Sequence, residues 1–267
     1  MYCDFHAHTS FSSDSEAAPQ AQIKKAISLG MKKLCITDHE DIDYPSEYGM
    51  PFVFDYDEYY ACLSELRELY SDKIELLIGV ELGLQPHLGE VLAEYTANHK
   101  FDFIIGSTHL VDRVDTYYPE MFTGLSEYDA LLKYFEELLL NIQTFNDFDV
   151  LGHIDYIVRY TPSGGLMYNC HDFDDIIDEI LNYAILHGIG IECNTARLGS
   201  GFLHCNPHED IIKRYRELGG EIITLGSDSH TPRTLANKFK VAGEILKEAG
   251  FKYYTVFKDR KPEFLPL

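Results

Sequence analysis

Short apolar segments alternate with longer segments of helical periodicity along the whole chain. The apolar segments are rich in β-branched and aromatic residues and have the length of buried strands. We expect strands at residues 2–6, 33–37, 74–80, 101–106, 149–152, 190–193 and 222–226. We expect helices at residues 18–29, 57–70, 88–98, 126–145, 172–186, 207–218 and 235–249.

This alternation predicts an α/β fold in which parallel strands are covered by helices. An open sheet and a closed barrel both satisfy the pattern. Residues 5–10 (FHAHTS) follow the first strand without the glycines of a dinucleotide or phosphate loop, which favours the barrel. No repeat, low-complexity tract or linker divides residues 1–267, so we expect a single domain.

Two connections are longer than a compact barrel needs. Residues 40–54 and 110–124 are both rich in Tyr, Phe, Asp and Pro. Long loops of a barrel usually carry function, and we expect residues 110–124 to form a lid.

The net charge of the chain limits the classes of molecule that the protein is expected to bind. The 22 Lys and Arg residues are outnumbered by 44 Asp and Glu residues, which gives a formal net charge of -22. Such a surface repels nucleic acids and anionic membranes, so neither is an expected partner. No segment has the length and apolarity of a membrane span, and no signal sequence is apparent, so we expect a cytoplasmic protein. The six cysteines lack metal-site or redox spacing and are expected to be buried thiols.

Side chains that can bind metals stand at the end of every predicted strand. Because the carboxyl ends of parallel strands meet at one rim, we expect these side chains to gather there. Their imidazole and carboxylate groups, without thiolates, predict a site for several hard or borderline divalent ions. The strand-end residues are His6, His8, Asp38, His39, Glu81, His109, His153, Asp155, Glu192, Asn194, Asp228 and His230.

These motifs, in this order, resemble the polymerase and histidinol phosphatase (PHP) superfamily. They read DFHAH at 4–8, TDH at 37–39, Glu81, STH at 107–109, GHID at 152–155, ECN at 192–194 and SDSH at 227–230. Within the superfamily, the stretch FDVLGHIDY at 148–156 is most similar to the monofunctional histidinol phosphatases. The resemblance implies a distorted (β/α)7 barrel that holds three divalent metal ions, which are zinc, manganese or iron.

The resemblance also implies how the ligands divide among the three ions. The first ion would be held by His6, His8, Glu81 and Asp228, the second by Glu81, His109 and His153, and the third by Asp14, His39 and His230. Some relatives have a histidine where Asp14 stands. An anionic oxygen ligand favours a harder ion, manganese or iron, at the third position.

The implied reaction is the hydrolysis of L-histidinol phosphate to L-histidinol and phosphate in histidine biosynthesis. The attacking group would be a hydroxide that bridges two metals, with Asp228 and His230 at the reacting centre. Arg159 and Arg197 each follow a strand-end motif by a few residues, and we expect their guanidinium groups to bind the phosphate. The acidic, Tyr-rich loops suit a phosphate monoester with a cationic leaving group.

Some assignments stay open at this point. Asp38, Asp155 and Glu192 are expected to orient ligand histidines through hydrogen bonds. A nucleotide or oligonucleotide phosphoesterase and a protein tyrosine phosphatase of the same superfamily are alternative functions. A metal-binding accessory domain without activity is a further alternative. A monomer and a small homo-oligomer are both compatible with the sequence.

Overall fold

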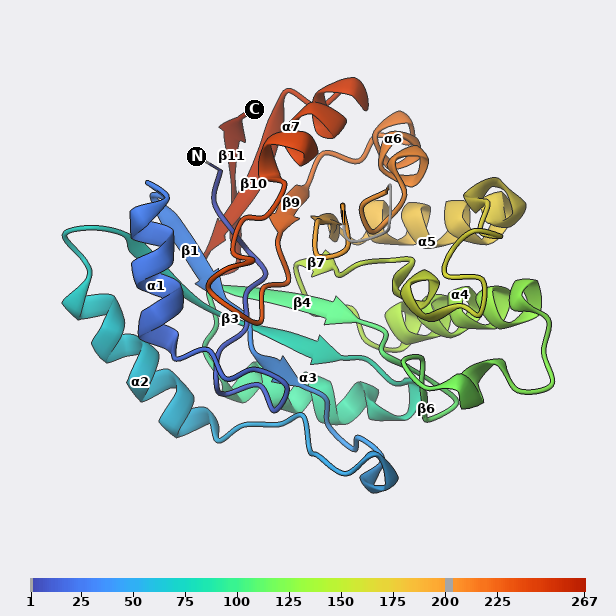
Figure 1. Cartoon of the computed structure of the whole chain (residues 1–267), viewed down its shortest axis with the longest axis horizontal. Helices are drawn as coiled ribbons and strands as arrows, with labels where there is room; N and C mark the ends of the chain where they lie inside the picture. The colour runs from blue at the N-terminus through green and yellow to red at the C-terminus, as the bar shows by residue number, and fades with distance from the viewer. Residues whose placement is uncertain (1, 200–203) are drawn as a thin grey trace.

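The computed structural model of the chain describes residues 2–199 and 204–267. Its centre is a curled sheet in which every paired strand is parallel to its neighbour (Figure 1). The strands in spatial order are β1 (Lys33–Ile36), β3 (Glu75–Gly83), β4 (Phe103–Ser107), β7 (Val150–Leu151), β8 (Gly190–Asn194) and β9 (Ile223–Gly226). The short strand β2 (His39–Glu40) continues the direction of β1 and pairs with the second half of β3.

Residues 4–8 close this sheet into a barrel by joining its two edge strands. The backbone N–H of Cys35 in β1 donates to the carbonyl of Asp4 (2.9 Å), and that of Asp228 after β9 donates to the carbonyl of His6 (2.8 Å). The segment bonds alternately to its two neighbours and forms isolated bridges, so the strand predicted at 2–6 is irregular. The expected distorted barrel with parallel strands and outer helices is confirmed.

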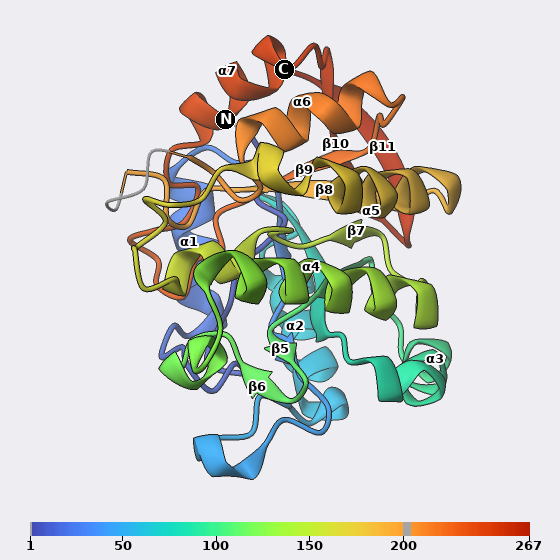
Figure 2. The ribbon, with the colours of Figure 1, turned by 90° about the vertical axis from the view of Figure 1, so that its right-hand side faces the viewer.

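Helices cover the outside of the barrel, and Figure 2 shows α4 to α7 stacked in chain order. Side-chain caps begin three of these helices, α2, α4 and α6: at the start of α4, for example, the Ser126 hydroxyl accepts from the N–H of Asp129 (3.1 Å). Their ends lie within four residues of the predicted ends. The helices are α1 (Pro19–Ser28), α2 (Tyr56–Leu69), α3 (Gly89–Asn98), α4 (Glu127–Thr144), α5 (Asp174–Leu186), α6 (Glu209–Glu217) and α7 (Phe239–Glu248).

A C-terminal hairpin of β10 (Tyr253–Lys258) and β11 (Lys261–Pro266) was not predicted. The ring of Phe257 packs against that of Phe103 at the start of β4, with centroids 5.0 Å apart. The Nε of Arg260 donates to the carboxylate of Asp149 just before β7 (2.8 Å). The hairpin therefore covers the amino end of the barrel, opposite to the rim on which the predicted ligands stand.

The long connection 110–124 has structure of its own. It contains a small hairpin of β5 (Leu110–Val111) and β6 (Val114–Asp115), followed by a 3-10 turn, η3 (Pro119–Phe122). All six cysteines are free thiols, as expected; five of them are buried, and Cys62 is only partly buried. Among the described residues, no helix has the length and apolarity required to cross a membrane.

Candidate metal centre

Glu81 is the residue on which the predicted ligands converge. It lies near the end of β3, is fully buried, and directs its two oxygens to different histidines. Its Oε1 lies 3.3 Å from Nε2 of His109 and 3.0 Å from Nε2 of His153. Its Oε2 lies 3.1 Å from Nε2 of His6 and 3.4 Å from Nε2 of His8. One carboxylate thus joins the two ligand sets that were predicted to share it.

Asp228 completes the group around His6 and His8. Its Oδ1 lies 3.7 Å from Nε2 of His6 and 3.4 Å from Nε2 of His8, and these two nitrogens are 3.1 Å apart. The backbone of Asp228 has a φ of 51°, a left-handed conformation that Asp tolerates. This turn directly after β9 brings its carboxylate toward the histidines of the first segment.

Asp14, His39 and His230 form the third predicted group on the open side of the cluster. The Oδ2 of Asp14 lies 3.0 Å from Nε2 of His230 and 3.8 Å from Nε2 of His39. The ring of His8 stacks on both histidines, with centroids 4.3 Å from His39 and 4.2 Å from His230. All nine predicted ligands therefore lie together, and we call these nine residues the donor cluster.

The spacing of the donor cluster fits bound divalent ions. Two nitrogen or oxygen ligands of a tetrahedral ion lie about 3.3 Å apart when each bond is about 2.0–2.1 Å long. The separations around Glu81 and Asp228 range from 3.0 to 3.7 Å. Oε2 of Glu81 and Nε2 of His230 are buried polar atoms that lie close to facing donor atoms without a hydrogen bond of normal geometry. Such orphaned atoms among several facing donors are expected where a cation is the missing partner.

The charges within the donor cluster favour the metal-binding forms of Glu81, Asp228 and His8, whereas nearby carboxylates outweigh burial and raise the pKa of His6, His39, His109 and His230. Burial opposes ionisation of Glu81 and Asp228, but the surrounding histidines outweigh it and hold the pKa of both carboxyl groups well below the usual range. Burial, assisted by the neighbouring His230 and His39, lowers the pKa of His8 to about 3. Ionised carboxylates and a neutral imidazole are the forms that coordinate a cation.

Buried side chains behind the donor cluster fix its imidazole rings. Glu192 accepts a hydrogen bond from Nδ1 of His6 (2.6 Å), as predicted. Asp41 accepts from Nδ1 of His109 (2.7 Å), and its other oxygen lies 3.4 Å from Nδ1 of His39. Asp41 was not predicted, although its position two residues after His39 in the sequence was a signal. These bonds leave Nε2 of His6 and of His109 for coordination.

Two of the expected orienting carboxylates have other contacts. Asp38 reaches no ligand directly; it accepts from the hydroxyl of Ser12 (2.6 Å), whose oxygen in turn lies 3.0 Å from Nδ1 of His8. The prediction for Asp155 was wrong, because its oxygens accept from the side chain of Asn206 (2.6 Å) and the N–H of His208 (2.9 Å). At a strand end, sequence position does not determine the direction of the side chain.

Arg159 lies directly against the donor cluster. Its guanidinium donates to the Asp228 carboxylate (2.9 Å), to the Asn194 side chain (2.9 Å) and to the Asn206 side chain (2.9 Å). Arg197 is half-buried beside it, with its Nη2 3.5 Å from the carbonyl of Arg159. Arg159 therefore adjoins the cluster at Asp228, and Arg197 adjoins the backbone of Arg159.

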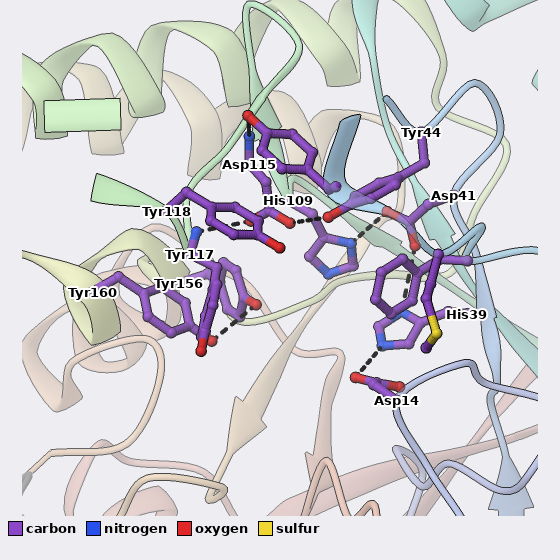
Figure 3. Close-up of a pocket in the computed structure, with 13 residues that line it drawn as sticks. Asp14, His39, Asp41, Tyr44, His109, Asp115, Tyr117, Tyr118, Tyr156 and Tyr160 are labelled. Atoms are coloured by element: carbon purple, nitrogen blue, oxygen red, sulfur yellow. Dashed lines mark hydrogen bonds and ion pairs between the residues drawn. The ribbon is translucent and has the colours of Figure 1, made fainter. Parts of the chain in front are cut away.

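A pocket of about 430 Å³ opens next to Asp14, His39 and His109 (Figure 3). The two long connections supply much of its wall, and the stacked rings of Tyr48 and Tyr118, 4.4 Å apart, join them. Asp115 in β6 accepts hydrogen bonds from the hydroxyl of Tyr44 and the N–H of Tyr117. The aromatic lining consists of Tyr44, Tyr48, Phe52, Tyr117, Tyr118, Tyr156 and Tyr160.

Comparison with known proteins places this geometry in a family. The profile of the PHP domain matches residues 4–196, which include most of the donor cluster. The chain belongs to the PHP domain family. This PHP protein is 35% identical over 257 residues to a probable histidinol-phosphatase of Clostridium acetobutylicum, covering 94% of this chain and 95% of the relative. It is 30% identical over 259 residues to the histidinol-phosphatase of Lactococcus lactis, covering 97% and 95%.

A solved structure is similar to this PHP protein over nearly its full length. It is the histidinol phosphate phosphatase of Lactococcus lactis in complex with zinc, L-histidinol and phosphate. The two structures agree with a TM-score of 0.90 at 28% sequence identity, and the alignment covers 98% of each chain. This PHP protein is therefore a full-length homologue of histidinol-phosphatases and shares their fold.

Proposed function

We propose that this protein hydrolyses L-histidinol phosphate to L-histidinol and phosphate, as a phosphoric monoester hydrolase of histidine biosynthesis. The observation that carries the proposal is the full-length likeness to a phosphatase solved with both products. The likeness is supported by chemistry at the expected rim, where a donor cluster, two arginines and an acidic aromatic pocket adjoin.

The donor cluster would hold three divalent ions in the sets predicted from the sequence. Ions bound there would act as Lewis acids and make hydroxide available near neutral pH. Glu81 is suited to the shared position because its two oxygens face separate histidine pairs. Asp14 gives the third set an anionic, more exposed ligand, which favours manganese or iron at that position.

Arg159 and Arg197 bind the phosphate group in this proposal. The planar guanidinium of Arg159 is fixed by three side-chain acceptors before substrate arrives, so little rotational freedom is lost on binding. Asp228 serves both as a ligand and as the anchor of Arg159. These two functions of Asp228 support a phosphate site between the arginines and the metals.

The aromatic pocket receives the cationic end of the substrate. Asp115 supplies a carboxylate within a wall of tyrosine rings, and both features attract an ammonium or imidazolium group. Because this wall lies beside Asp14 and His109, a substrate whose cationic end contacts it would direct its phosphate end toward the metals. Closure of residues 110–124 as a lid stays a prediction.

Steady-state kinetics on metal-loaded protein test the proposal. L-histidinol phosphate should be hydrolysed with a kcat/KM far above those of a phosphotyrosine peptide, a nucleotide and single-stranded DNA. Preferred hydrolysis of one of these three would support a different phosphoesterase of the superfamily. Metal uptake without hydrolysis of any ester would support an accessory domain. A cytoplasmic location and a monomer or small homo-oligomer stay predictions.

A further inference from the structure

Three glycines at the carboxyl ends of strands adjoin groups that contact the donor cluster. Gly83 ends β3, Gly226 ends β9 and Gly152 follows β7. None of the three has a positive φ, so backbone conformation does not require glycine at these positions. Glycine within a strand otherwise weakens it, and it often marks the close approach of another group.

At Gly83 the approaching group is Asp41. A Cβ on Gly83 would overlap Oδ1 and Cγ of Asp41 and lie 3.0 Å from its Cβ. The same Oδ1 accepts the hydrogen bond from Nδ1 of His109 (2.7 Å). Asp41 is only 3% exposed and has little room to move elsewhere. The absence of a side chain at Gly83 therefore leaves room for the Asp41 carboxylate, which orients the ring of His109.

At Gly226 the approaching group is Glu192. A Cβ on Gly226 would overlap Oε1 of Glu192 and lie 2.6 Å from Cβ of His6. That Oε1 accepts from Nδ1 of His6 (2.6 Å), while Oε2 accepts from the N–H of His153 (3.0 Å). Glu192 is thus held at both oxygens, and a methyl group would have to displace it from a ligand.

At Gly152 the approaching group is the hydroxyl of Ser107. A Cβ there would overlap Oγ of Ser107 and lie 2.8 Å from a methyl group of Ile105. The Ser107 hydroxyl donates to Oε1 of Glu81 (2.7 Å). Each of the three glycines therefore adjoins the partner of a different predicted ligand.

We propose that Gly83, Gly226 and Gly152 are positioning residues of the metal centre. Each acts through the polar side chain that comes nearest to the position of its missing Cβ, which is Asp41, Glu192 and Ser107 respectively. This inference rests on the proposed function, since it presumes that the donor cluster binds metal. An added methyl group turns a ligand away from the ion while leaving the strand pairing intact. Loss of an orienting partner typically lowers metal affinity by about 10- to 100-fold.

The test measures the zinc affinity of full-chain variants, each of which carries one added methyl group at a glycine, and compares it with that of the wild type. Gly83→Ala and Gly226→Ala should each weaken zinc binding by about 10- to 100-fold, measured by chelator competition on metal-stripped protein. Gly106→Ala is the control, because its Cβ would meet the ring of Phe148 at 2.9 Å, away from the donor cluster. The control should lower the melting temperature and leave zinc affinity unchanged.

A double variant separates this mechanism from general destabilisation. Removing the Asp41 side chain vacates the space that the methyl group at position 83 needs. Adding Gly83→Ala to Asp41→Ala should therefore cause no further loss of zinc affinity. Additive losses would overturn the proposal. If Gly83→Ala alone does not fold, the double variant should fold, and its failure to do so would also overturn it.

The outcomes distinguish this inference from the proposed function. Wild-type protein that takes up no zinc, manganese or iron would contradict the metal centre itself. Wild-type protein that binds zinc, with Gly83→Ala and Gly226→Ala binding it equally well, would contradict only the role of the glycines.

Discussion

The guanidinium of Arg159 and the carboxylate of Asp228 form a buried ion pair at 2.9 Å. Asp228 also faces two histidines of the donor cluster through its other oxygen. A phosphate-binding group and a metal ligand are thereby held by the same carboxylate. Changes at either partner should affect both substrate binding and turnover.

Replacing Arg159 by lysine should lower kcat/KM for L-histidinol phosphate by about two orders of magnitude. A single ammonium group cannot reproduce the planar guanidinium that bonds Asp228, Asn194 and Asn206 at once. Metal content should stay near that of the wild type. Kinetics and metal analysis of Arg159→Lys check this, and an unchanged kcat/KM would remove Arg159 from the phosphate site.

Arg197→Ala should mainly raise KM, by about 10- to 100-fold, because one charge-assisted hydrogen bond to phosphate is lost. The kcat should change much less, since the donor cluster and Arg159 remain. Steady-state kinetics over a wide range of substrate concentrations separate the two constants. A KM equal to that of the wild type would argue against phosphate binding by Arg197.

Asp228→Asn should reduce turnover by more than about 100-fold and deplete bound metal. Asparagine tolerates the left-handed backbone at this position, so circular dichroism should show an intact fold. Asp259→Asn is a matched control, because Asp259 also has a positive φ and is exposed in the C-terminal hairpin at the opposite end of the barrel. Equal activity of the two variants would be incompatible with a ligand role for Asp228.

Chelation should abolish activity and lower the melting temperature. Ions that bind only the folded chain stabilise it by about 4 kcal/mol when the free ion is 1,000 times its Kd. Calorimetry before and after removal measures this, and adding zinc or manganese back should restore both properties. Full turnover by metal-free protein would refute the proposed chemistry.

Stability of the metal-free protein should depend on Glu40. Burial raises the pKa of this carboxyl group from 4.5 to about 7. Between these values the folded chain holds a proton that the unfolded chain releases, so the free energy of unfolding falls as pH rises. The total cost is about 3 kcal/mol above pH 7. Glu40→Gln should therefore raise the melting temperature at pH 8 but not at pH 4.5. An equal change in melting temperature at both pH values would contradict the raised pKa of Glu40.

Eight of the nine residues of the donor cluster could be predicted from a rule about strand ends, whereas Asp14 lies in a loop and was predicted only from the resemblance to the PHP superfamily. Once His6, Glu81 and His153 are known to end parallel strands, they must meet at one rim. The rule does not give side-chain direction, which is why Asp155 was misplaced. The rule also missed Asp41. The contact of Asp41 with His109 is possible only because residue 83 is a glycine and has no side chain.

The C-terminal hairpin could not be predicted from its turn. Asp259 and Arg260 both adopt positive φ, at 49° and 60°. Hairpin turns of this kind usually show Asn-Gly or Asp-Gly in the sequence. Here the turn is held by tertiary bonds, including one from the N–H of Arg260 to the carbonyl of Asp102 (2.9 Å). Such a bond has no counterpart in the local sequence.

Closure of the barrel by residues 4–8 sets the order of events during synthesis. His6 and His8 leave the ribosome more than 200 residues before Asp228. The backbone bond from Asp228 to His6 brings these ligands together only when the last barrel strand is in place. A nascent chain that ends before β9 cannot assemble the first ligand set, so an ion bound by all four ligands of that set would report that translation has passed the final strand.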